Sequence, residues 1–229
     1  MSITCIKDVI RNINIVIGCP IGCTYCYARI NCLRFHSTED FSVPVFFEEK
    51  LRLLEKKKSR AYFLTGQSDL AYWKEEWLEK VFSKMEENPD TQYLFLSKRP
   101  ERLSLKKTPE NGWFGVTVTS SKEKQRIEDL KKNVSSGNLH ITFEPLFDDI
   151  GEVDLDGISW IVIGTETGSR KGKAVTRREW VYSLLNQARK KGIPVFMKED
   201  LLGIMKEEEM VQEFPSSFLH TEKQERIEL

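Results

Sequence analysis

Seven short apolar runs alternate along the chain with segments of helical character, and this alternation limits the possible folds more than any other feature. The apolar runs are rich in Val, Ile, Leu and Phe, which is typical of buried strands. They cover residues 12–18, 61–65, 92–96, 113–119, 139–143, 158–163 and 194–197. Segments 46–57, 74–87, 121–133 and 178–191 carry apolar residues at spacings of three and four, which predicts helices between the strands.

The alternating order predicts an α/β fold with parallel strands, because such strands need crossover connections that helices usually supply. About seven strand–helix units favour a partial or complete TIM-like (β/α) barrel over an open doubly wound sheet. A chain of 229 residues, 40% of them hydrophobic, can build one such domain over residues 1–229. Within it, residues 206–229 are predicted to form a C-terminal helix and tail.

The charge balance gives no general preference for nucleic acid or an anionic membrane, because 35 basic residues are matched by 35 acidic ones. We find no apolar run of membrane-spanning length and no signal peptide, so we expect a cytoplasmic protein with no membrane partner. Five cysteines in a reducing compartment indicate a site more than a disulfide framework.

Polar residues follow most of the predicted strands, at the point where each strand ends. The carboxyl ends of parallel strands meet at one rim, so these side chains are expected to lie together. Asp69 and Ser120 are equally suited to cap helices, and the charged residues could instead form a Lys–Glu network across the rim. The candidates are Thr65, Gly66, Gln67, Asp69, Lys98, Thr117, Thr119, Ser120, Gly164, Glu166 and Lys198.

Three cysteines lie within eight residues directly after the first predicted strand: Cys19, Cys23 and Cys26. Thiolates at such spacing can hold a [4Fe–4S] cluster. A ferredoxin supplies four cysteines per cluster, so three would leave one iron open to a small molecule. Two alternatives are an electron-transfer cluster and a zinc site with Cys5, Cys32 or His36 as fourth ligand.

The spacing CxxxCxΦC, with Tyr25 at the aromatic position, resembles the motif of the radical S-adenosylmethionine (SAM) superfamily. The resemblance implies a barrel of the radical SAM type, a [4Fe–4S] cluster on the three cysteines, SAM on the open iron, and an electron donor such as flavodoxin or ferredoxin. It also implies reductive cleavage of SAM to a 5′-deoxyadenosyl radical that takes hydrogen from a substrate. The catalytic residues would be Lys98, Glu166 and Lys198, and the SAM-binding residues Tyr25, Thr65, Gly66, Gln67, Asp69, Thr117, Thr119, Ser120, Gly164 and Glu166.

A closer resemblance rests on the strings LSKRPERL, FGVTV, FEPL, WIVIGTETG and IPVFMK. They are similar, in the same order, to strings of the phage-associated three-Cys-motif family of radical SAM-like proteins, whose fold resembles that of spore photoproduct lyase. The substrate stays open: a nucleotide, a nucleic acid or a peptide. Alternatives are a lyase that repairs nucleic-acid lesions or modifies nucleotides, with basic runs at 56–60, 98–107 and 170–178, and a non-catalytic iron–sulfur binding module.

Overall fold

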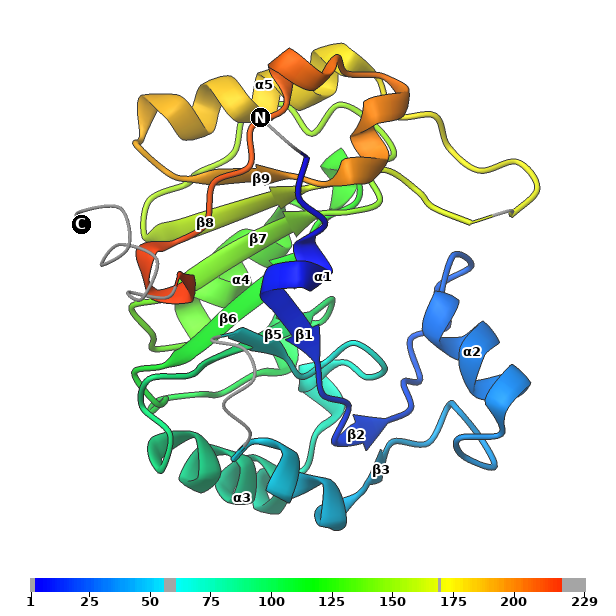
Figure 1. Ribbon diagram of the computed structural model, residues 1–229, viewed down its shortest axis with the longest axis vertical. Coiled ribbons are helices and arrows are strands. Elements are labelled where there is room, and N and C mark those ends of the chain that lie inside the picture. Colours follow the sequence, from blue (N-terminus) through cyan, green and yellow to red (C-terminus); the bar gives the residue numbers. More distant parts are fainter. Residues whose placement is uncertain (1–2, 56–60, 169, 220–229) are drawn as a thin grey trace, which may run out of the picture.

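The computed structural model describes residues 3–55, 61–168 and 170–219 of the chain. Its centre is a seven-stranded sheet in which all neighbouring strands are parallel. The sheet curls into a half-barrel with β1 and β9 at its two edges (Figure 1). The strands are β1 (Ile10–Asn12), β4 (Ala61–Phe63), β5 (Gln92–Ser97), β6 (Gly112–Thr117), β7 (Leu139–Phe143), β8 (Ile158–Ile163) and β9 (Val195–Met197). The predicted α/β fold with parallel strands is confirmed, in the form of an open half-barrel.

The first predicted strand, residues 12–18, is wrong in its extent. The sheet strand β1 ends at Asn12, after which the Ile13 amide donates one more hydrogen bond to the Phe63 carbonyl. The chain then leaves the sheet, and β2 (Val16–Ile17) pairs antiparallel with β3 (Val45–Phe46). Two asparagines, Asn12 and Asn14, interrupt the apolar run, which explains why it does not continue as one buried strand.

The helices that cover the convex face of the sheet lie close to where the periodicity predicts them. They are α3 (Glu75–Glu86), α4 (Gln125–Asn133) and α5 (Arg178–Lys190), and α1 (Ile6–Val9) and α2 (Tyr27–Phe35) lie elsewhere (Figure 1). The prediction for 46–57 is wrong in type, because the described part forms a 3₁₀ helix at Glu48–Leu53; residues 56–60, with their predicted basic run, lie outside the described residues. Further 3₁₀ turns are Leu70–Tyr72, Pro100–Arg102, Ser121–Glu123, Glu199–Gly203, Glu207–Glu209 and Ser216–Phe218.

The C-terminal segment differs from the predicted helix and tail over residues 206–219. It begins with the 3₁₀ turn Glu207–Glu209, runs antiparallel to β9 with a bridge between Phe196 and Gln212, and includes a second 3₁₀ turn at Ser216–Phe218. Phe214 and Phe218 then pack against the concave face of the sheet, and this apolar burial outweighs the helical preference of the acidic run. Residues 220–229 lie outside the described part.

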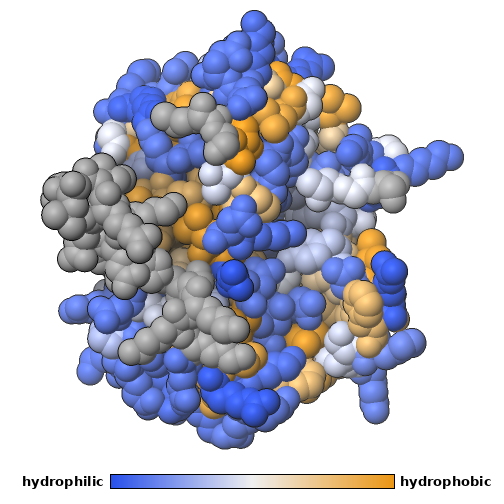
Figure 2. Space-filling model, viewed as in Figure 1, coloured by the Kyte–Doolittle hydropathy of each residue, from blue (hydrophilic) through white to orange (hydrophobic). Residues whose placement is uncertain are grey.

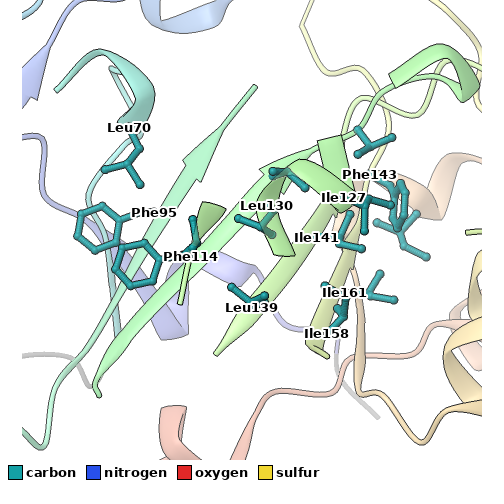
Figure 3. Close-up of a cluster of buried hydrophobic side chains, with 14 of the residues drawn as sticks. Leu70, Phe95, Phe114, Ile127, Leu130, Leu139, Ile141, Phe143, Ile158 and Ile161 are labelled. Atoms are coloured by element: carbon teal, nitrogen blue, oxygen red, sulfur yellow. The ribbon is translucent and has the colours of Figure 1, made fainter. Parts of the chain in front are cut away.

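Alternate residues of each strand pack on opposite faces of the sheet. On the convex side, the rings of Phe95 and Phe114 stack with 5.1 Å between their centres, and Ile127 and Leu130 of α4 belong to the same core (Figure 3). On the concave side, the rings of Trp113 and Trp160 contact Phe218 and fill the end nearer the amino termini of the strands. The opposite, carboxyl-terminal end is therefore the one left for a site.

In the part of the chain that the structure describes, no helix is both long and apolar enough to cross a membrane.

Candidate cofactor site

The cysteine loop follows β2 and is fastened to the end of β4. The Gly18 amide donates to the Gln67 carbonyl at 2.9 Å, and the Cys19 amide donates to the Phe41 carbonyl at 2.6 Å. Gly18 has φ +121°, and a Cβ there would lie 2.5 Å from the Val43 carbonyl oxygen, so only glycine fits this close approach. Gly22 also adopts a positive φ of +76°, which lets the loop curl.

Cys19, Cys23 and Cys26 are half-buried and line one cavity of about 530 Å³. Cys26 is the N-cap of α2, and its Sγ accepts a hydrogen bond from the Arg29 amide at 3.4 Å. The Arg29 guanidinium donates to the Cys19 carbonyl at 3.2 Å, which joins the two ends of the loop. The free amides of a helix N-terminus favour negative charge, so this position suits a metal-bound thiolate.

The remaining two cysteines have other partners. Cys32 is 2% exposed, and its Sγ contacts the Thr38 hydroxyl at 3.1 Å, so it packs in the interior beside α2. Cys5 donates its thiol proton to Glu199 Oε1 at 3.0 Å. The loop thus presents three soft ligands and no fourth cysteine.

The two kinds of metal centre considered above make different demands on the cysteine loop. Within the described ranges, no group of three or more His, Cys, Asp or Glu side chains converges on a single metal ion, so the zinc alternative gains no support. A cluster makes a different demand, because each cysteine binds a different iron and the sulfurs need not meet at one point. All three cysteines line the same cavity, and burial raises the pKa of the Cys19 thiol to about 11. The residues present therefore fit an iron–sulfur cluster.

Two tyrosines of the loop connect it to the rim. Tyr25 lines the cavity and packs edge to face against Phe147, with 5.2 Å between the ring centres. Burial raises the pKa of its hydroxyl, and the charge of Cys23 acts in the same direction. Tyr27 donates its hydroxyl proton to the Gly66 carbonyl at 2.8 Å. Sequence reasoning missed Tyr27, because this residue lies just outside the cysteine motif and its partner is 39 residues away.

The predicted residues after β4 all line the cavity: Thr65, Gly66, Gln67 and Asp69. Asp69 is 5% exposed and caps the turn that follows it, accepting from the Ala71 amide at 3.0 Å. It also accepts from the Ser97 hydroxyl at 2.7 Å and the Lys98 amide at 2.8 Å, so it fastens the end of β5 to that of β4. Its position matches the capping alternative, with little capacity left for a ligand.

The predicted residues after β6 separate. Thr117 lines the cavity, whereas Thr119 and Ser120 do not. The Thr119 hydroxyl donates to Glu123 at 2.8 Å, and Ser120 precedes the turn Ser121–Glu123 as its N-cap without a side-chain hydrogen bond.

The charged residues after β7, β8 and β9 are paired with one another. Glu166 is 4% exposed and accepts two hydrogen bonds from Arg170, at 2.5 and 2.8 Å. Lys198 pairs with Glu144 and lies 3.7 Å from Asp200. Burial raises the pKa of Asp200 to about 6. Gly164 lies behind this pair, since a Cβ there would be 3.1 Å from Lys198 Cδ. The Lys–Glu network considered from the sequence is therefore present at this part of the rim.

Lys98 is different, because none of the ion pairs within the described residues involves it. Its Nζ lies 5.9 Å from the centre of the Tyr25 ring, and its side chain lines the cavity beside the cysteines. It is thus a cation that remains free to bind an anionic group. Other cavity residues that sequence reasoning missed are Asn12, His140 and Thr142, which lie on the concave face and had no neighbouring motif to mark them.

The outer face of α2 is apolar and exposed. Ile30, Leu33 and Phe35 are 64%, 67% and 66% exposed, and Figure 2 shows this apolar surface over α2.

Together these features define an α/β half-barrel protein with a three-cysteine loop at the carboxyl-terminal rim of its sheet. The chain belongs to DUF5131, a protein family of unknown function, which matches residues 4–218. No curated protein and no solved structure matches the chain.

Proposed function

We propose that this protein is a radical SAM enzyme, with a [4Fe–4S] cluster bound by Cys19, Cys23 and Cys26. The observation that carries the proposal is the placement of three cysteines, and only three, at the mouth of a cavity on the carboxyl-terminal rim of a parallel half-barrel. Three protein ligands leave the fourth iron open, which is the condition for SAM to bind.

When bound by Cys19, Cys23 and Cys26, the cluster with SAM would supply radical chemistry: with one electron from a flavodoxin- or ferredoxin-like donor, SAM would be cleaved reductively to methionine and a 5′-deoxyadenosyl radical able to take hydrogen from a substrate. The protein's part is to bind, orient and exclude water. The Tyr27–Gly66 hydrogen bond holds the cysteine loop against the end of β4, so both sides of the site keep a fixed spacing.

Lys98 is the residue assigned to the carboxylate of SAM or substrate, because its ammonium lines the cavity without an acidic partner in the described residues. Glu166 and Lys198 also line the cavity, but each is held by an ion pair, with Arg170 and Glu144 respectively. Their paired charges would position polar groups of the cofactor without moving, since the pairing fixes both side chains.

The first test is the iron and sulfide content of anaerobically reconstituted protein, together with 5′-deoxyadenosine formation after addition of dithionite and SAM. We expect about four irons and four sulfides per chain and slow formation of 5′-deoxyadenosine. Cys26→Ala should abolish both, whereas the control Cys5→Ala should retain both, because Cys5 is hydrogen-bonded to Glu199 away from the loop. Lys98→Ala should keep the iron and weaken SAM binding by about tenfold, the loss of one charge-assisted contact.

Two outcomes would contradict the proposal. If Cys5→Ala removed the iron as completely as Cys26→Ala, the site would be a four-cysteine one. If a fully loaded cluster neither bound SAM nor yielded 5′-deoxyadenosine, the protein would be an iron–sulfur binding module and not an enzyme of this class.

A further inference from the structure

His140 is the second residue of β7 and points to the concave face of the half-barrel. It is 2% exposed and lines the same cavity as the cysteines. Its ring lies over Gly115 of the neighbouring strand, where a Cβ would be 2.5 Å from the ring atoms Cε1 and Nε2. Glycine at 115 therefore leaves the space that this imidazole fills.

The structure fixes the tautomer of His140. Its Nε2 lies 3.1 Å from the Phe95 carbonyl oxygen, which can only accept a hydrogen bond, so Nε2 carries the proton. Burial lowers the pKa of His140 to about 4 against the opposing effect of the Phe95 and Trp113 backbone groups, so the ring is neutral near pH 7. In the neutral ring the other nitrogen, Nδ1, is an unprotonated acceptor. It is buried and has no hydrogen-bond partner in the described part of the chain. Buried acceptors are nearly always paired, so a donor from outside the chain is expected here.

The surroundings of His140 are uncharged. The charged side chains that line the cavity lie beyond the strands, either before β1 or after a carboxyl end: Lys7, Asp69, Lys98, Glu144, Glu166 and Lys198. The strand positions between them present flat apolar surface and neutral hydrogen-bonding groups, which we call the inner chamber: Asn12, Leu94, Thr117, His140, Thr142, Trp160 and Val162. Such a lining favours a neutral group over an ionised one, because a charge there would lose its hydration without gaining a partner.

We propose that the inner chamber binds the reacting end of the substrate, and that this end is an uncharged planar lactam or imide whose N–H donates to His140 Nδ1. This inference rests on the proposed function, in which SAM takes the rim part of the cavity beside the cysteines. An amide N–H meets the free acceptor, and the hydroxyls of Thr117 and Thr142 or the amide of Asn12 can donate to its carbonyl oxygen. His140 is then a substrate-binding residue and not a general base, because its low pKa disfavours taking a proton.

The test measures equilibrium binding of three small probes to the anaerobically purified protein by calorimetry, without SAM or reductant. Uracil is a neutral planar imide with N–H donors, 1,3-dimethyluracil lacks those donors, and orotate adds a carboxylate to the same ring. We expect saturable binding of uracil, with 1,3-dimethyluracil and orotate each weaker by about tenfold or more, because one leaves Nδ1 unpaired and the other brings a charge.

A variant pair separates hydrogen bonding from packing. His140→Phe keeps a flat ring over Gly115 but removes both nitrogens, and should reduce the preference for uracil over 1,3-dimethyluracil to about twofold or less. The control Ile141→Val alters the next residue of β7, which packs in the convex core and does not line the cavity, so the preference should persist. The readout is the ratio of two affinities, which a general loss of packing would not change.

Nitrogen-15 NMR of histidine-labelled protein provides a second measurement that needs no variant. We expect His140 to show the Nε2–H tautomer at pH 7 and the Nδ1 resonance to shift on addition of uracil. Equal binding of the three probes, no saturable binding of uracil, or a proton on Nδ1 would overturn the inference. These results do not depend on SAM cleavage, so failure here can be told apart from failure of the proposed enzyme.

Discussion

Asp69 offers a sharp test of how the rim is held together. Its carboxylate is 5% exposed and accepts hydrogen bonds from the Ser97 hydroxyl, the Lys98 amide and the Ala71 amide. Asp69→Ala would leave one buried and two partly buried donors unpaired and open a small cavity. Hydrogen bonds to a charged group contribute about 1.5–3 kcal/mol each, and their energies are not fully additive when they share one acceptor group. We therefore expect Asp69→Ala to lower the free energy of unfolding by about 3–5 kcal/mol.

Asp69→Asn separates the shape of the side chain from its charge. One amide oxygen can still accept from Ser97 and Ala71, but the amide NH₂ would face the Lys98 amide, donor against donor. The expected loss is therefore about half that of Asp69→Ala. Asp90→Ala, in the exposed turn before β5, is the matched control and should change stability by less than about 0.5 kcal/mol.

The assay is thermal unfolding of the three variants and the parent protein, followed by circular dichroism under anaerobic conditions. For a chain of this size, about 1 kcal/mol corresponds to about 2–4 °C, so Asp69→Ala should lower the midpoint by roughly 6–20 °C. If its midpoint stayed within about 2 °C of the Asp90→Ala control, the carboxylate would not be holding the strand ends, and our account of the rim would be wrong.

Two further predictions concern the effect of pH on stability. Hydrogen bonding to Arg170 lowers the pKa of Glu166 below its usual 4.5. The contribution of this carboxylate to the free energy of unfolding is therefore present above pH 4.5 and is lost as pH falls through the lower pKa of the folded state. Glu166→Gln should lower the thermal midpoint at pH 7 more than at pH 3, and an equal effect at both would contradict the ion pair. Burial raises the pKa of Asp200 from 3.8 to about 6. The contribution of the protonated carboxyl to the free energy of unfolding is therefore full below pH 3.8 and is lost as pH rises through 6. Asp200→Asn should therefore stabilise the protein more at pH 8 than at pH 5, which a melting series across that range would check.

Much of the fold could be predicted because strands and helices leave local patterns. The apolar runs at 139–143 and 158–163 correspond to β7 and β8 without change, and α5 ends one residue before its predicted boundary. The errors occur where a distant contact outweighs the local pattern. Residues 12–18, predicted as one strand, contribute to two different sheets. The segment from residue 206, predicted as a helix, instead runs antiparallel to β9 through the bridge between Phe196 and Gln212.

In the candidate site, too, residues with a local pattern could be predicted and residues placed by distant contacts could not. Cys19, Cys23 and Cys26 are found from their spacing, because ligands of one centre that lie in one loop leave a short motif. Tyr27 and His140 leave no such motif. The first has a partner 39 residues away, and the second is marked only by its position opposite Gly115 on the neighbouring strand.

The sequence by itself determined that the strands are parallel, that their polar ends share one rim, and that three cysteines lie at that rim, since these follow from periodicity and chain order. Only the tertiary structure decided which of the charged ends are free. Glu166 is held by Arg170 and Lys198 by Glu144, whereas Lys98 remains unpaired within the described residues. The physical reason is that the strength of an ion pair or hydrogen bond depends on distance and burial. Both are set by strands that meet only after the sheet has curled.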